Sequence, residues 1–255
     1  MASFVLLWDQ LIVLTSKNLK LKYNSTCLGF AWSLIVPAFT SLIYYFVFGV
    51  VMRWAVDYYL QYLLCGTFMW QFFSNIIFVN GGILISNASL LKKMNFNRHL
   101  LVWGTVLSEG FHFLLTLPVL LVIMFCYHIT PQWWSIVPNL FVSIFLLILF
   151  SVGISYFYSA LNLYFRDLER IVNILMSLWM FISPVFIPIS AVPKQYLSFY
   201  TLNPITGIIG TFRDVFYQPA FCPESWIYPA VVSVVVFLSG WWFFSWMSPS
   251  FAEKM

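Results

Sequence analysis

Lysines near the N-terminus are the first residues in the chain that could bind a charged ligand. Lys20 and Lys22 precede Tyr23, and a short polar turn then leads to Leu28 and Gly29. Glycine can adopt a positive φ and expose backbone N–H groups, so this corner and the lysines could hold a lipid phosphate. The alternative is a plain turn at the start of a helix.

A second cationic segment lies between Asn87 and His99. Its central residues are Lys92, Lys93, Met94, Asn95, Phe96, Asn97 and Arg98. These cations could meet the acidic surface of a partner protein and transmit its motion to the helices. The alternative is that they are ordinary membrane anchors on the cytoplasmic side.

A third cluster alternates in sign, with Arg166 and Asp167 followed by Glu169 and Arg170. It could couple the helix that follows to the N-terminal helix or to a partner. The alternative is a self-neutralising surface cluster, because exposed ion pairs contribute little stability.

Glu109 and His112 belong to a polar face within a long apolar run. Thr105, Ser108 and Thr116 fall on the same face of a helix. Ionisable groups at membrane depth are costly and usually face protein or water. The face therefore predicts either a hydrated channel wall or proton site, or polar contacts between helices in which Glu109 pairs with His112.

Aromatic residues make up 21% of the chain, more than two interfacial belts require. Aromatic rings can stack on the apolar faces of sugars, which would let a polymer slide past them. The alternative is that they face lipid or pack inside the protein. The candidates for a channel lining are Trp32, Phe39, Tyr44, Phe48, Trp179, Phe181, Phe186, Tyr196, Phe199 and Tyr200.

No pattern indicates a catalytic or metal site. The chain has no G-x-x-x-x-G-K-[ST] phosphate loop, so ATP hydrolysis would require another chain. Its four cysteines show no C-x-x-C pairing, and its three histidines are far apart in the sequence. We therefore expect no cofactor in this chain.

The composition indicates a membrane protein. Charged residues make up 8% of the 255 residues and apolar residues 62%, with a mean hydropathy of +0.90. An average soluble domain has about 25% charged residues. The apolar runs are continuous rather than alternating, which predicts an all-α integral membrane protein.

The apolar runs predict six transmembrane helices within residues 24–255. Residues 1–23 are predicted to form an amphipathic helix at the cytoplasmic interface, because their apolar part is too short to cross a bilayer. Prolines and aromatic residues after the fifth span predict a re-entrant or short-helix periplasmic insert. The predicted spans cover residues 27–50, 60–85, 100–125, 136–160, 171–193 and 226–247.

The positive charges predict the orientation. With both termini in the cytoplasm, nine of the twelve Lys and Arg residues lie inside, and only Arg53, Lys194 and Arg213 lie outside. This bias agrees with the positive-inside rule. The net charge of +4 is therefore a membrane signal, and we expect no nucleic acid partner.

Six segments carry a family resemblance by their order. They are LKLKYNSTCLGFAWSLIVP at 19–37, GTFMWQFFSN at 66–75, LLKKMNFNRHLL at 90–101, YFRDLERIV at 164–172, SPVFIP at 183–188 and LNPITGII at 202–209. Together they resemble the permease subunit of type-2 ABC exporters of O-antigen, capsule or teichoic-acid polymers (Wzm-like). The third segment departs from the usual K-x-x-F-P-R, because Asn97 replaces the proline.

The resemblance implies a homodimer in the bacterial inner membrane, with two cytosolic ABC ATPase subunits that bind ATP and Mg. It also implies a polysaccharide on a polyprenyl pyrophosphate lipid, which passes through a continuous aromatic-lined channel. In that family the Leu28–Gly29 corner is associated with the headgroup entrance, and the loop of residues 92–98 with the ATPase.

We therefore expect a translocation subunit for lipid-linked polysaccharide rather than an enzyme. One alternative is an ABC permease for a drug or small lipid, which an aromatic-poor channel wall would favour. The other is an integral membrane transferase, which needs clustered catalytic carboxylates or histidines at one membrane face.

Overall fold

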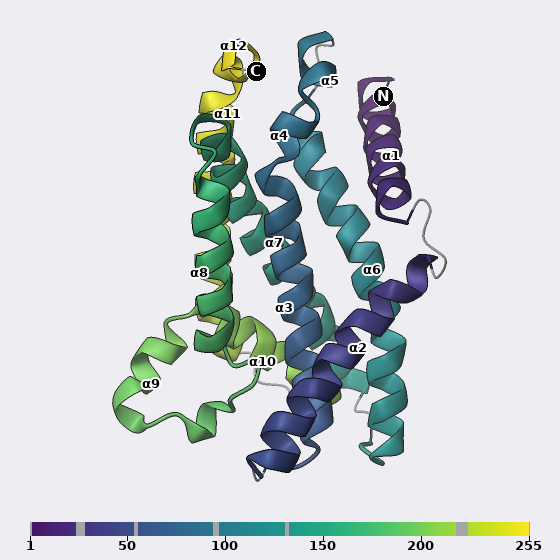
Figure 1. Cartoon of the computed structure of the whole chain (residues 1–255), viewed down its shortest axis with the longest axis vertical. Helices are drawn as coiled ribbons and strands as arrows, with labels where there is room; N and C mark the ends of the chain where they lie inside the picture. Colours follow the sequence, from purple (N-terminus) through teal and green to yellow (C-terminus); the bar gives the residue numbers. More distant parts are fainter. Residues whose placement is uncertain are drawn as a thin grey trace.

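The computed structural model describes residues 2–23, 29–53, 56–93, 97–130, 133–217 and 224–254, and the regular structure in these ranges is entirely helical. Figure 1 shows both termini at the same end of the molecule. In chain order the helices are α1 (Ala2–Tyr23), η1 (Gly29–Ala31), α2 (Trp32–Tyr44), η2 (Tyr45–Val51), α3 (Tyr59–Gly81), α4 (Ile83–Ser86), α5 (Ala88–Lys93), α6 (His99–Cys126), α7 (Trp133–Tyr164), α8 (Leu168–Ile182), η3 (Ile189–Ala191), α9 (Lys194–Thr201), α10 (Pro204–Phe216), α11 (Glu224–Met247), η4 (Ser248–Ser250) and α12 (Phe251–Lys254).

Five helical segments of the described chain are long and apolar enough to cross a bilayer. They overlap five of the six predicted spans, and the all-α fold class is confirmed. The five segments are Leu34–Val51, Tyr59–Gly81, His99–Cys126, Ile136–Tyr164 and Ser225–Ser250.

The predicted span over residues 171–193 is shorter than expected. Its helix, α8, has 15 residues and ends at Ile182. Ser183 adopts an extended backbone with ψ 153°, because the residue before a proline disfavours the helical conformation and Pro184 follows. The sixth crossing and the form of the insert therefore remain predictions. The segment beyond α8 contains the short helices α9 and α10 at the lower end of Figure 1.

Helices α3 and α7 form the centre of the fold. Most residues of α3 are buried, because α2, α6, α7 and α10 pack around it. α7 also packs extensively against α11. A Cβ atom at Gly153 of α7 would lie 2.6 Å from the backbone carbonyl of Val236 in α11. Small residues of this kind allow helix backbones to approach closely within membranes.

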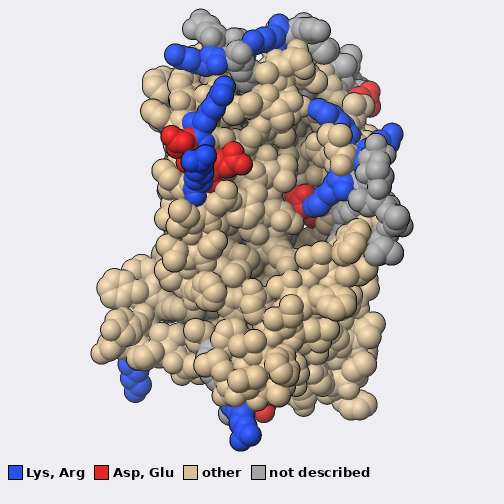
Figure 2. Space-filling model, viewed as in Figure 1, with Lys and Arg blue, Asp and Glu red and all other residues tan. Residues whose placement is uncertain are grey.

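Charge divides the molecule along its long axis. Figure 2 shows most Lys and Arg side chains at the upper end, which Figure 1 places around α5, α12 and the N-terminus. On the face shown, a broad band without charge lies below them, and a few charges reappear at the lower end. The uncharged band has the character of a surface that faces hydrocarbon.

Candidate functional site

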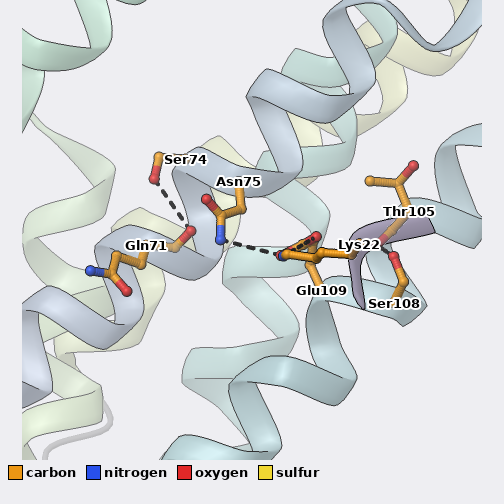
Figure 3. A network of polar contacts seen from close by, with 7 residues as sticks. All are labelled: Lys22, Gln71, Ser74, Asn75, Thr105, Ser108 and Glu109. Carbon is orange, nitrogen blue, oxygen red and sulfur yellow. Dashed lines mark hydrogen bonds and ion pairs between the residues drawn. The ribbon is translucent and has the colours of Figure 1, made fainter. Parts of the chain in front are cut away.

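An ion pair lies where the end of α1 meets α3 and α6 (Figure 3). The Nζ atom of Lys22 is 2.8 Å from both carboxylate oxygens of Glu109, and Asn75 Nδ2 donates to one of them at 3.2 Å. The sequence considered His112 as the partner of Glu109, whereas the structure provides Lys22 from a distant part of the chain. Within the described residues this is the one ion pair closer than 4.0 Å.

The two members of the pair differ in their surroundings. The Glu109 side chain is 4% exposed, whereas that of Lys22 is 40% exposed. A buried carboxylate without a counter-charge is costly, and here Lys22 supplies the counter-charge while the Asn75 amide adds a hydrogen bond. The pair therefore fixes the end of α1 to the helix bundle.

A glycine allows α1 to approach α6 closely enough for this contact. A Cβ atom at Gly104 of α6 would lie 3.1 Å from the Cβ atom of Leu14. Leu14 is itself buried between the two helices. Lys17 adds a second polar link, because its Nζ donates to Asn87 Oδ1 at 2.7 Å.

The ion pair borders a cavity of about 500 Å³ between α2, α3 and α6. α3 contributes Gln71 and Asn75, one turn apart, and α6 contributes Glu109, His112 and Thr116 over two turns. The helical period therefore aligns polar groups of both helices along one gap. α2 crosses α3 and α6 obliquely and closes the other side (Figure 1).

Aromatic side chains form the apolar part of the cavity wall. Phe72 and Phe113 stack with ring centroids 4.8 Å apart, and Phe68 and Trp32 also line the space. Trp32 is 45% exposed, so its ring can still take a ligand on its face. The cavity thus combines a polar wall with aromatic surfaces.

The predicted headgroup entrance is only partly described. Lys20 is exposed, while Lys22 is directed to Glu109. Gly29 has φ +47° with no atom within 4 Å of an added Cβ, so backbone conformation rather than space favours glycine there. Leu28 and the side chain of Tyr23 lie outside the described residues, and contact with a headgroup remains a prediction.

Two cations of the predicted coupling segment, Lys92 and Arg98, differ in their surroundings. Lys92 is exposed at the end of α5. Arg98 instead contacts the carbonyl and hydroxyl oxygens of Ser248, the latter at 2.7 Å, and lies over Phe251. Arg98 therefore holds the C-terminal helices in place. Asn97 Oδ1 accepts from the His99 backbone N–H at 3.2 Å, which supports the first turn of α6.

The structure describes the predicted coupling segment only in part. Met94, Asn95, Phe96 and the side chain of Lys93 lie outside the described residues. Contact of the segment with an ATPase remains a prediction.

The cluster at 166–170 is a surface feature. Arg166, Asp167, Glu169 and Arg170 are all exposed, and no pair among them comes within 4.0 Å in the described structure. Asp167 immediately precedes α8 without a side-chain cap. These charges are therefore available to a partner or to lipid headgroups.

The ten candidate channel aromatics differ in exposure. Only Phe186 is buried, at 2% exposure, where it packs against Tyr44 and Phe181. Tyr44, Phe48, Trp179 and Tyr200 are partly buried, and the exposed rings are Trp32, Phe39, Phe181, Tyr196 and Phe199. Which of them face a channel remains a prediction.

Sequence reasoning missed a buried cation at the opposite end. The sequence analysis places Arg213 on the outer side of the membrane and does not predict its burial, but the side chain is 6% exposed. Its guanidinium lies 3.4 Å from the ring centroid of Tyr62, donates to the Tyr62 hydroxyl at 2.7 Å and donates to the Val185 carbonyl at 3.0 Å. Gly66 leaves room for this group, because an added Cβ would lie 2.8 Å from the Val185 oxygen.

The helical periodicity of α10 could have predicted that Arg213 is buried. It falls one turn after Ile209 and two turns after Ile205, both buried residues of α10. Arg213 connects α10 and α3 to the Pro184–Pro188 turn. This turn is therefore fixed at the lower end of the bundle.

Asn203, in the sequence Leu-Asn-Pro, connects the start of α10 to the end of α8. Its Oδ1 accepts from the Ile205 backbone N–H and from the Trp179 indole, each at 3.1 Å. Its Nδ2 donates to the Ser183 hydroxyl at 2.9 Å. The side chain thus caps α10 and connects it to the end of α8.

Comparison with known proteins places these features in a family. The ABC-2 type transporter family matches residues 9–217. An "O-antigen export system permease protein RfbA" of Klebsiella pneumoniae is 36% identical over 212 residues, which are 82% of this chain and 81% of the relative. Its counterpart in Myxococcus xanthus is 29% identical over 248 residues, 96% of this chain and 95% of the relative. The "Polysialic acid transport protein KpsM" of Escherichia coli is 24% identical over 231 residues, 88% of each chain.

Proposed function

The chain belongs to the ABC-2 type transporter family, and we propose that it is the permease of an ATP-driven exporter of lipid-linked polysaccharide. The observation that carries the proposal is its similarity to O-antigen export permeases over most of both chains. The sequence contains no phosphate loop, so two copies of a separate ATPase chain supply the energy from ATP and Mg.

The membrane arrangement follows from the distribution of charge. The uncharged band of Figure 2 crosses the hydrocarbon of the bacterial inner membrane, and the charged end with both termini faces the cytoplasm. α8 makes the sixth crossing, since its 15 residues extend about 22 Å and residues 183–188 continue the path. α9 and α10 form the periplasmic insert.

A second copy of the chain completes the channel. α2 and α8 lie on the near face of the molecule in Figure 1 and expose aromatic side chains, among them Phe39 at 63% and Phe181 at 56%. Two such faces opposite each other would enclose an aromatic-lined path. The polymer would slide along it through weak stacking contacts.

The cytoplasmic end supplies the two remaining contacts. Lys92 of α5 is exposed and suits an acidic surface of the ATPase. Lys20 near the end of α1 is exposed and suits the pyrophosphate of the lipid carrier, whereas Lys22 is held by Glu109.

Deletion of the gene in its host tests the proposal. The deleted strain should lack the polymer at the cell surface and accumulate its lipid-linked form on the cytoplasmic side, and a plasmid copy should restore export. Normal surface polymer in a strain without a second exporter would refute the proposal and favour a drug or small lipid as cargo.

Complementation with charge variants tests the contact with the ATPase. Lys92→Glu should reduce export, because it reverses an exposed charge at the cytoplasmic end. Lys194→Glu is the matched control, since Lys194 is exposed on α9 at the opposite end. Equal export by the two variants would exclude a role for Lys92 in coupling.

A further inference from the structure

The cavity beside the Lys22–Glu109 pair has the chemistry of a ligand site. Its volume of about 500 Å³ is within the roughly 300–1,000 Å³ of small-molecule sites. Glu109 borders it and is 4% exposed, so a polar group inside the protein faces the space.

The charge of the cavity favours a neutral ligand. Lys22 and Glu109 neutralise each other at 2.8 Å. An anionic ligand would have to displace Glu109 from Lys22 and leave a buried carboxylate unpaired, which is costly. A cationic ligand would displace Lys22 in the same way.

The polar wall suits a group that both donates and accepts hydrogen bonds. Gln71 lines the cavity and carries an amide, and Figure 3 shows that its side chain points away from the ion pair. The Thr116 hydroxyl donates to the Phe113 carbonyl at 2.6 Å and keeps its oxygen as an acceptor. Hydroxyl groups of a ligand match these donors and acceptors.

The aromatic wall suits a flat apolar surface with C–H groups. Phe72 and Phe113 form a stacked pair, and Trp32 presents a ring that is 45% exposed. A pyranose ring carries hydroxyl groups at its edge and C–H groups on its faces. It therefore matches the amides and the aromatic rings at once.

From this combination we propose that the cavity is a binding subsite for one neutral pyranose ring of the exported glycan, with Gln71 as a hydrogen-bonding residue and Trp32 as the stacking surface. The subsite rests on the proposed function and makes it specific. It lies at the cytoplasmic border of the uncharged band, where a sugar adjacent to the lipid carrier would enter. The Lys22–Glu109 pair forms one end of the subsite and keeps it neutral.

Binding of simple sugars to the purified full-length permease in lipid nanodiscs tests the subsite. The probes are methyl glucopyranoside, methyl galactopyranoside and methyl mannopyranoside at millimolar concentration, with inorganic pyrophosphate as the anionic comparison. Saturation-transfer NMR should show contact through the ring C–H protons of at least one pyranoside. Gln71→Leu should weaken this binding about five-fold, as expected for the loss of one hydrogen bond.

Two further variants keep the test decisive. Trp32→Ala removes the stacking surface from a partly exposed position and should weaken binding to a similar extent. Gln195→Leu makes the same change as Gln71→Leu on the exposed face of α9 and should leave binding unchanged. A thermal unfolding midpoint equal to that of the wild type shows that each variant is folded.

The outcomes separate the subsite from the proposed function. Absence of pyranoside binding would overturn the subsite. So would wild-type affinity for the pyranoside in both Gln71→Leu and Trp32→Ala, or Gln71-dependent binding of pyrophosphate alone. Any of these results combined with loss of surface polymer in the deletion strain would leave the export function intact. Failure of the export function would instead appear as normal surface polymer after deletion.

Discussion

Replacing Lys22 by methionine should destabilise the protein far more than replacing its partner Glu109 by glutamine. Glu109 is 4% exposed, so among the described residues Lys22→Met leaves this buried carboxylate with the Asn75 amide as its one close partner. Removing one member of a buried pair in this way costs about 3–5 kcal/mol.

Glu109→Gln should destabilise the protein less, because the remaining Lys22 side chain can reach water. The Lys22 side chain is 40% exposed, so after Glu109→Gln its ammonium group can turn outward. We expect a loss of about 1 kcal/mol from the missing charge-assisted hydrogen bonds. The double variant should lose about as much as Glu109→Gln, since it leaves no buried charge. Glu109→Gln therefore rescues Lys22→Met.

Thermal unfolding in nanodiscs, followed by tryptophan fluorescence, measures these differences. For a chain of this size 1 kcal/mol corresponds to about 2–4 °C in the unfolding midpoint. Lys22→Met should therefore lower the midpoint by roughly 6–20 °C, and Glu109→Gln by roughly 2–4 °C. Lys20→Met is the control, because Lys20 is exposed on the same helix, and it should change the stability by less than about 0.5 kcal/mol.

Two results would refute this reasoning. Equal midpoints for Lys22→Met and Glu109→Gln would mean that burial does not set the cost. A double variant as unstable as Lys22→Met would mean that Lys22 stabilises α1 by packing rather than by neutralising Glu109.

Three further predictions concern other parts of the structure. Gly153→Ala should lower the unfolding midpoint by the equivalent of about 1–3 kcal/mol, because the new Cβ atom would lie 2.6 Å from the Val236 carbonyl. Gly110→Ala meets no atom within 4 Å and should instead stabilise α6. Midpoint shifts of the same sign for the two variants would contradict this prediction. Arg213→Met should lower the unfolding midpoint by the equivalent of about 2–4 kcal/mol, because it leaves buried carbonyl oxygens unpaired. Arg213→Lys should not restore the stability, since lysine lacks the planar guanidinium group. Full stability with lysine would show that the planar guanidinium group is not required. Burial raises the pKa of Asp214 from its ordinary value of 3.8 to about 6. Its contribution to stability should therefore fall as pH rises from about 4 to about 6, and Asp214→Asn should remove this pH dependence of the unfolding midpoint. An unchanged pH dependence in Asp214→Asn would exclude Asp214 as its source.

The sequence predicted the helical class and most of the membrane-crossing segments, because long uncharged runs are sufficient to identify them. It failed to predict where α8 ends. The apolar run continues past Ile182, but Pro184 forces Ser183 out of the helical conformation. The steric effect of Pro184 on the backbone therefore ends α8 earlier in the chain than hydropathy predicted.

The sequence identified the functional residues in part. It located Glu109 and His112 on one face of a helix, and it found Lys20 and Lys22 as a cationic pair. It could not join Lys22 to Glu109, because 87 residues separate them. It predicted Arg98 to be a partner contact or a membrane anchor and placed Arg213 on the outer side, but it did not predict the internal contacts that hold each of them.

What the sequence by itself determined is the class of the protein. Its uncharged helical runs, the placement of its cations and the order of its motifs identify a membrane permease, because these properties are local and can be read along the chain. What only the tertiary structure decided is which polar groups meet. Gly104 lets α1 approach α6, which brings Lys22 to Glu109, and the helical periods of α3 and α6 place their polar side chains along one cavity. Such contacts depend on packing between distant segments, and no pattern within one segment encodes them.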